Sequence, residues 1–236
     1  IDILVSLYYQ GFLPGFGRVE KKDSVLSSLF LGKGHAAIAL YVILADLGFI
    51  EKAALEKLNR GGMLGEHPSP NIPGVSFLSG SLGHALSTGA GVALSASVDK
   101  KKEYVYVILG DGECYEGSVW EAALFASNQN LGNLCAIVDR NTLITNGSTE
   151  EINPLEPFAD KWAAFGWNVV NCDGHDFDEL GAALRSFTHE VSSKPTVIIA
   201  KTIKGKGVSF MEDVAAWHHG AITDDRLVAI LRELES

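Results

Sequence analysis

Two short apolar runs separated by a helical pattern dominate the middle of the chain. Residues 104–109 are rich in β-branched and aromatic side chains and end at Gly110, and residues 134–138 form a second run; this composition is typical of buried strands. Ser118 and Glu121, between the runs, have the spacing of a helix capping box. Small and apolar side chains follow there with helical spacing: Val119, Ala122, Ala123 and Ala126. The stretch therefore predicts a β-α-β unit whose parallel strands end at one edge of a sheet.

The flanking sequence repeats the same two patterns. Further strands are predicted at residues 25–31, 167–172 and 195–201. Helices are predicted at residues 2–11, 36–47, 51–60, 82–94, 154–165, 177–187 and 224–235. Residues 61–75, with their many glycines and prolines, and residues 204–220 are predicted to be long loops, and such loops are often functional.

Composition narrows the class of protein. A chain of 236 residues, 47% of them hydrophobic, is long enough for one domain with a two-layer or three-layer core, and we expect residues 1–236 to form a single domain. No apolar run approaches the roughly 18 residues that would span a membrane, and no signal-peptide pattern opens the sequence. The formal net charge of −10 argues against nucleic acid as a main partner.

The cysteines point to a reducing environment. Cys114, Cys135 and Cys172 are odd in number and show no CxxC spacing, so neither a disulfide framework nor a cysteine zinc site is predicted. A cytoplasmic location fits best.

Asp111 and Asn141 are the first candidates for chemistry. Each follows the end of a predicted strand, thirty positions apart, and ligands of open α/β sheets bind at that edge. A carboxylate and an amide oxygen, with backbone carbonyls of the following turn, suit Mg²⁺ or Ca²⁺. Because Mg²⁺ usually keeps positions for phosphate oxygens, a diphosphate is the expected partner, and Gly110 and Gly112 would let it approach the backbone. An Asp-Gly pair alone would be typical of a simple turn.

The pattern Gly110-Asp111-Gly112, followed after about thirty residues by Asn141, resembles the thiamine diphosphate (TPP) motif, and more narrowly the transketolase family. The resemblance runs from about Ile3 to Glu233 through six segments in the family's order. It implies a doubly wound, mostly parallel α/β sheet with helices on both faces. It also implies that the carbonyl of Leu143 completes a Mg²⁺ shell, and that Ile144 or Leu143 is the apolar side chain that keeps the cofactor bent. Further cofactor contacts implied by the resemblance are Gly80, Ser81 and Leu82 in a GSLG turn, with Gly110, Gly112 and Glu113.

The same resemblance implies roles for several of the histidines. A lone His35 would be taken for a helix-start residue, but its GHA segment matches the family histidine beside the thiazolium ring and diphosphate. His67 matches an HP segment that reaches the donor substrate. His218 and His219 compete for a third role, and His219, directly before Gly220, is favoured. His175, in a DGHD turn, is expected to be structural.

The resemblance also implies a partner. No residue matches the family glutamate that activates the pyrimidine ring, and the pyrimidine-binding and C-terminal domains are expected on a separate chain. The expected protein is the N-terminal subunit of a split transketolase, an α2β2 heterotetramer of carbohydrate metabolism. It would transfer a two-carbon ketol unit from a ketose to an aldose, with sugars or sugar phosphates as substrates.

Other interpretations stay open at this point. The chain could belong to a deoxyxylulose-phosphate-synthase-like or specialised ketol or acyl transferase, or could be a non-catalytic subunit that binds TPP and serves assembly. The GDG and Asn pattern also fits the α chain of a 2-oxoacid dehydrogenase, but the GSLG and WHHG segments fit transketolase better. A Rossmann dehydrogenase is disfavoured because no GxGxxG follows a predicted strand.

Overall fold

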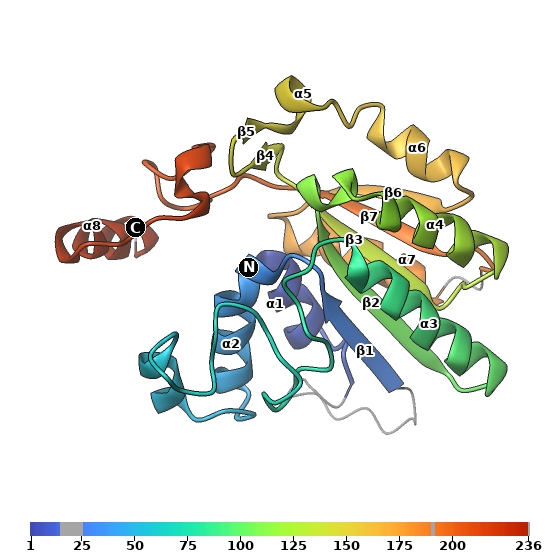
Figure 1. Ribbon diagram of the computed structural model, residues 1–236, viewed down its shortest axis with the longest axis horizontal. Coiled ribbons are helices and arrows are strands. Elements are labelled where there is room, and N and C mark those ends of the chain that lie inside the picture. The colour runs from blue at the N-terminus through green and yellow to red at the C-terminus, as the bar shows by residue number, and fades with distance from the viewer. Residues whose placement is uncertain (15–25, 190–191, 236) are drawn as a thin grey trace.

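A five-stranded parallel sheet forms the centre of the protein. The computed structural model describes residues 1–14, 26–189 and 192–235 (Figure 1). The strands lie in the order β1-β2-β3-β7-β6, and every neighbouring pair is parallel. Their bounds are β1 (Leu26–Leu31), β2 (Glu103–Gly110), β3 (Leu134–Arg140), β6 (Asn168–Asp173) and β7 (Thr196–Lys201). The five predicted strands are confirmed, except that Val25 lies outside the described residues.

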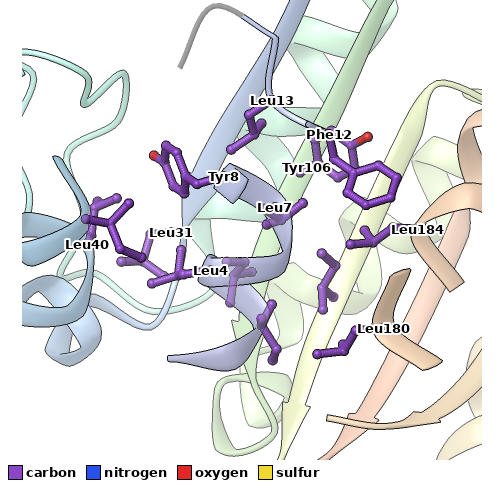
Figure 2. Close-up of a cluster of buried hydrophobic side chains, with 14 of the residues drawn as sticks. Leu4, Leu7, Tyr8, Phe12, Leu13, Leu31, Leu40, Tyr106, Leu180 and Leu184 are labelled. Carbon is purple, nitrogen blue, oxygen red and sulfur yellow. The ribbon is translucent and has the colours of Figure 1, made fainter. Parts of the chain in front are cut away.

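Helices cover both faces of the sheet. On one face lie α1 (Asp2–Tyr9), α2 (Ala37–Asp46) and α7 (Phe177–His189), and on the other lie α3 (His84–Val98), α4 (Gly117–Asn128) and α6 (Phe158–Ala164). Successive side chains of a strand alternate between the faces. Tyr106 and Ile108 of β2 therefore enter one core, whereas Val105 and Val107 enter the other. Figure 2 shows the first core, where Leu4 and Leu7 of α1 lie close to Leu180 and Leu184 of α7.

The order of the strands explains the two layers. The chain steps in one direction from β1 through β2 and β3 to β6, and then returns to β7 between β3 and β6. Because crossover connections between parallel strands are right-handed, a reversal of direction puts the connecting helix on the opposite face. This is why α7 lies opposite α4 and α6. The sheet is doubly wound, as predicted.

All five strands point the same way, so their carboxyl ends form one edge. The short elements gathered after them are η1 (Gly34–Ala36), η3 (Gly112–Tyr115), the antiparallel pair β4 (Leu143–Ile144) and β5 (Gly147–Ser148), α5 (Thr149–Ile152) and η4 (Ala215–His218). Helix α8 (Asp224–Leu234) closes the chain. Among the described residues we find no helix with the length and apolar character needed to cross a membrane.

Three local predictions were wrong. Residues 51–60 form a short 3₁₀ helix, η2 (Lys52–Lys57), instead of an α-helix. Helix α6 begins at Phe158, directly after Pro157, and not at Pro154. Helix α4 begins at Gly117 without a side-chain cap, because the hydroxyl of Ser118 donates to the carbonyl oxygen of Gly83 and joins the starts of α3 and α4.

Candidate functional site

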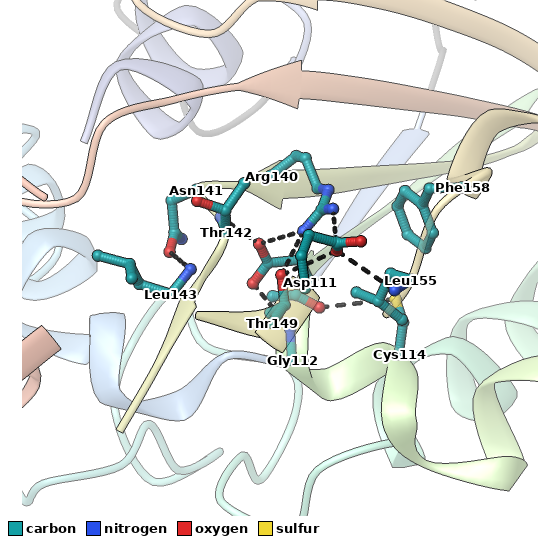
Figure 3. A network of polar contacts seen from close by, with 12 residues as sticks. Asp111, Gly112, Cys114, Arg140, Asn141, Thr142, Leu143, Thr149, Leu155 and Phe158 are labelled. Atoms are coloured by element: carbon teal, nitrogen blue, oxygen red, sulfur yellow. Dashed lines mark hydrogen bonds and ion pairs between the residues drawn. The ribbon is translucent and has the colours of Figure 1, made fainter. Parts of the chain in front are cut away.

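Asp111 and Asn141 lie together at the carboxyl edge of the sheet, as the sequence predicts. The backbone N–H of Asp111 donates to the carbonyl of Asp139, 3.3 Å away, which ties the ends of β2 and β3. The side chain of Asp111 is 2% exposed. Its two oxygens accept from the backbone N–H groups of Gly112, at 2.8 Å, and Thr142, at 2.6 Å (Figure 3). The carboxylate is thus fixed in one orientation.

Arg140, the last residue of β3, holds Asp111 from the other side. Its Nη1 lies 3.2 Å from Asp111 Oδ2 and donates to Thr149 Oγ1, and its Nη2 donates to Glu150 and Glu156. Burial raises the pKa of Asp111, and the hydrogen bonds from Thr142, Gly112 and Arg140 only partly offset this. Arg140 was not predicted as a site residue. The only signal in the sequence was an arginine at a strand end followed by three glutamates within sixteen residues.

Asn141 and Leu143 form a tight turn beside this carboxylate. The Asn141 side-chain oxygen accepts from the N–H of Leu143 at 3.1 Å, and its Nδ2 donates to Asp139 Oδ1 at 3.2 Å. Thr142, between them, has a φ of 63°, in the left-handed region that a β-branched residue rarely adopts. Strain of this kind persists where surrounding contacts hold it, and here Asp111 holds the Thr142 N–H. The turn therefore holds the Asn141 side chain at the end of β3, next to the end of β2 that carries Asp111.

Lys33 and Lys204 bring positive charge to the same edge, and neither was predicted. Lys33, in the turn after β1, forms an ion pair with Asp139, which also accepts from Thr202. Burial would raise the pKa of Asp139, but Lys33 and the hydrogen bonds from Thr202 and Asn141 hold it well below its usual range. Burial and the neighbouring Lys33 ammonium lower the pKa of Lys204.

Glycines bring the surrounding loops close together. Glu113 is buried, and its carboxylate accepts from the backbone N–H of Gly83 at 3.0 Å and of Gly110 at 3.2 Å. A Cβ at Gly32 would lie 2.4 Å from this carboxylate. Glu113 therefore joins three loops, and its expected contact with a cofactor stays a prediction. Ile144 similarly lies against Gly112, where a Cβ would come within 2.3 Å of Ile144 Cγ2.

The GSLG turn lies beside His67. Gly80 has a φ of 121°, and a Cβ there would come within 3.2 Å of the His67 ring. Ser81 and Leu82 are exposed. The turn thus offers accessible backbone next to the histidines, as a cofactor-binding turn requires.

Four histidines from three loops meet above this edge. His35 Nδ1 lies 3.1 Å from His218 Nε2, and the His35 ring centroid is 4.6 Å from that of His219 and 5.3 Å from that of His67. The structure brings both His218 and His219 to His35. Burial, with the neighbouring His219 and His67, lowers the pKa of His35. Burial and the Lys204 ammonium lower the pKa of His218 to about 4.

His175 supports the site from outside. Its Nδ1 lies 2.6 Å from Asp2 Oδ2, and its Nε2 accepts from the backbone N–H of Ile203 at 2.8 Å. It connects α1 to the turn that carries Thr202 and Lys204. This arrangement is consistent with a structural residue.

The residues at this edge fit a hard divalent cation and a diphosphate. Asp111 and Asn141 offer anionic and neutral oxygens, which such ions prefer. Asp111 is buried and has a raised pKa, so a cation beside it would favour its ionised form. Lys204 offers positive charge for phosphate oxygens. The neutral imidazoles of His35 and His218 can accept or donate protons near a bound substrate.

Comparisons with known proteins agree with one another. Residues 27–234 match the family described as "Transketolase, thiamine diphosphate binding domain". The chain is 40% identical over 237 positions to a subunit of the apulose-4-phosphate transketolase of Phocaeicola vulgatus, covering 99% of this chain and 83% of that protein. It is 43% identical over 241 positions to "6-deoxy-6-sulfo-D-fructose transketolase subunit SqwG" of a Clostridium species, covering 99% and 85%.

A solved structure shares the fold. The crystal structure of transketolase from Campylobacter jejuni superposes with a TM-score of 0.82 at 25% identity, covering 89% of this chain but only 34% of that one.

Proposed function

We propose that this chain, which belongs to the transketolase family by its thiamine diphosphate-binding domain, is the N-terminal subunit of a split transketolase. It holds Mg²⁺ and the diphosphate of TPP, and a separate chain supplies the pyrimidine-binding and C-terminal domains. The observation that carries the proposal is the convergence of Asp111 and Asn141 at the ends of two neighbouring strands. Two relatives that are named as transketolase subunits match 99% of this chain, and this supports the proposal.

Three oxygens would hold the metal. They are the carboxylate of Asp111, the side-chain oxygen of Asn141 and the backbone carbonyl of Leu143. Lys204 would add positive charge for the diphosphate. Ile144, whose position against Gly112 is fixed by close packing, would be the apolar contact that keeps the cofactor bent. The GSLG turn, with Gly80, Ser81 and Leu82, would contact the cofactor from the opposite loop.

The reaction is transfer of a two-carbon ketol unit from a ketose to an aldose. When bound, TPP supplies the carbanion chemistry. This chain's histidines, His35, His67, His218 and His219, orient substrate oxygens and move protons at the ring nitrogens. Because burial lowers the pKa of His35 and His218, both rings are neutral at pH 7, so each can accept a proton first and then return it.

The names of the relatives support a substrate class for this chain. Their names give apulose 4-phosphate and 6-deoxy-6-sulfo-D-fructose, and we extend only the class, a sugar or sugar phosphate, to this chain. An α2β2 heterotetramer would place the cofactor between chains. Cys114, Cys135 and Cys172 are all buried free thiols, and this fits the reducing cytoplasm that we propose for the complex.

Replacing Asp111 tests the proposal. Asp111→Ala and the isosteric Asp111→Asn should both abolish Mg²⁺-dependent TPP binding, measured calorimetrically in the presence of the partner chain. Circular dichroism would show whether each variant folds. Asp160→Ala, at an exposed carboxylate of α6, is the control and should bind normally. If folded Asp111→Asn bound TPP as tightly as the unaltered chain, the metal-site assignment would be wrong.

A further inference from the structure

Three of the clustered histidines have the spacing of a metal site that differs from the oxygen site below them. One ring nitrogen from each of His35, His218 and His219 lies within 4.8 Å of the other two. One pair, His35 Nδ1 and His218 Nε2, is 3.1 Å apart. The three side chains come from η1, which follows β1, and from the end of η4, and all are at least partly exposed. An ion could reach them from solvent.

These distances suit tetrahedral coordination. Zinc binds imidazole nitrogen at about 2.0–2.1 Å, which puts two ligand nitrogens of a tetrahedral site about 3.4 Å apart. His35 Nδ1 and His218 Nε2, at 3.1 Å, are slightly closer than that value, and all three nitrogens lie within 4.8 Å of one another. Exposed side chains can close such a difference by small rotations about χ1 and χ2.

The protonation states also favour a metal. Only an unprotonated imidazole nitrogen can bind a metal ion. Burial and the surrounding charges lower the pKa of His35 and of His218, so these rings are neutral at pH 7. Binding would therefore displace few protons at neutral pH.

Two charged side chains next to the histidines have opposite effects on metal binding. Glu66 Oε1 lies 3.9 Å from His35 Nε2, on the side of the ring away from His218, where a carboxylate favours the tautomer whose Nδ1 is free to bind a metal. Lys204 Nζ lies 3.4 Å from His218 Nδ1 and opposes a bound cation. His67, whose ring centroid is 5.3 Å from that of His35, is not one of the three ligands.

We propose that His35, His218 and His219 bind a borderline-soft transition-metal ion of the Zn²⁺ class through three imidazoles, with a fourth position open to solvent. The ligand types separate the two sites, because imidazole suits zinc and cobalt whereas carboxylate and amide oxygens suit magnesium. This binding does not depend on the proposed function. If that function holds, the bound ion withdraws three histidines from the sugar channel and inhibits ketol transfer.

Cobalt is the probe, because tetrahedral Co²⁺ has a visible absorption that Zn²⁺ lacks. Titration of Co²⁺ into the tag-free chain should produce this absorption at one equivalent, and Zn²⁺ should displace it. His35→Ala, His218→Ala and His219→Ala should each lower the affinity by more than the roughly 10–100-fold that loss of an outer-shell partner costs. His84→Ala and His189→Ala, at exposed histidines outside the cluster, are the matched controls and should leave the titration unchanged.

A second variant, at Lys204, should change the affinity for Co²⁺ in the opposite direction. Lys204→Met removes the ammonium beside His218 while keeping an unbranched side chain that is one atom shorter, and should raise the affinity for Co²⁺. Absence of the tetrahedral absorption, or absorption that survives all three cluster variants, would overturn the proposal. Mg²⁺-dependent TPP binding is measured separately, so failure of the cobalt titration would leave the proposed function standing.

Discussion

The guanidinium of Arg140 lies 3.2 Å from the carboxylate of Asp111, and the two residues are 6% and 2% exposed. The same guanidinium donates to Thr149, Glu150 and Glu156, so one side chain joins a proposed metal ligand to the start of α5 and the loop after it. It also lies over the ring of Phe158, 5.5 Å from the ring centroid. Arg140 thereby positions Asp111 and offsets part of the negative charge at the edge of the sheet.

Replacing Arg140 should destabilise the fold. Arg140→Met leaves the buried Asp111 carboxylate without its cation, and losing one partner of a buried ion pair costs roughly 3–5 kcal/mol. Urea unfolding monitored by tryptophan fluorescence measures the change. Glu156→Gln removes a partner whose side chain is 59% exposed and should cost no more than about 1 kcal/mol. Equal losses for the two variants would contradict the role given to Arg140.

Gly112 should be intolerant of a methyl group. A Cβ at this position would lie 2.3 Å from Ile144 Cγ2, so Gly112→Ala must displace Ile144 or the turn that carries it. Overpacking of this kind costs roughly 1–3 kcal/mol, and the affinity for TPP should fall because Ile144 is a proposed cofactor contact. Gly117→Ala is the control, since its Cβ would meet nothing within 4 Å. Unchanged stability and TPP affinity in Gly112→Ala would show that this packing is unimportant.

Because of the lowered pKa of His218, the protein should be less stable in mild acid than at neutral pH. That pKa is lowered to about 4, so between that value and the ordinary histidine value of about 6.5 the unfolded chain binds a proton that the folded chain does not. This contribution to stability is complete above the unfolded pKa and declines as the pH falls toward 4. Asp111 and Glu113, with raised pKa values, contribute in the opposite direction.

A difference measurement isolates the His218 contribution. Urea unfolding of the unaltered chain and of His218→Gln at about pH 7.5 and about pH 5 should show a smaller loss of stability in the variant. His84→Gln serves as the control and should lose as much stability as the unaltered chain. The assignment fails if His218→Gln and the unaltered chain respond to pH in the same way.

The sheet could be predicted because its strands are nearly continuous apolar runs. Residues 105–109 and 134–138 are fully or almost fully buried, and buried parallel strands need such runs on both faces. The helices, which combine apolar and polar side chains, were harder to predict from the sequence. Ser118 and Glu121 have the capping-box spacing, yet Ser118 bonds to Gly83, a residue 35 positions away that no local pattern could indicate.

The site residues also divide into those that the sequence could predict and those that it could not. Asp111 and Asn141 follow strands directly and His35 lies in the short turn after β1, so their place at the edge of the sheet could be predicted from the chain order alone. Arg140, Lys33 and Lys204 were missed because their importance comes from partners brought close only by the fold. The sequence favoured His219 over His218 for the third histidine role, whereas in the structure both rings contact His35.

A cofactor site shared between two chains can be tested by calorimetric titration of TPP and Mg²⁺ into this chain, alone and mixed with a partner chain that carries a pyrimidine-binding domain. A parallel assay would follow ketol transfer from a ketose donor. We expect tight binding and ketol transfer only in the mixture. Turnover by the chain alone, or no TPP binding in either sample, would contradict the split-enzyme proposal.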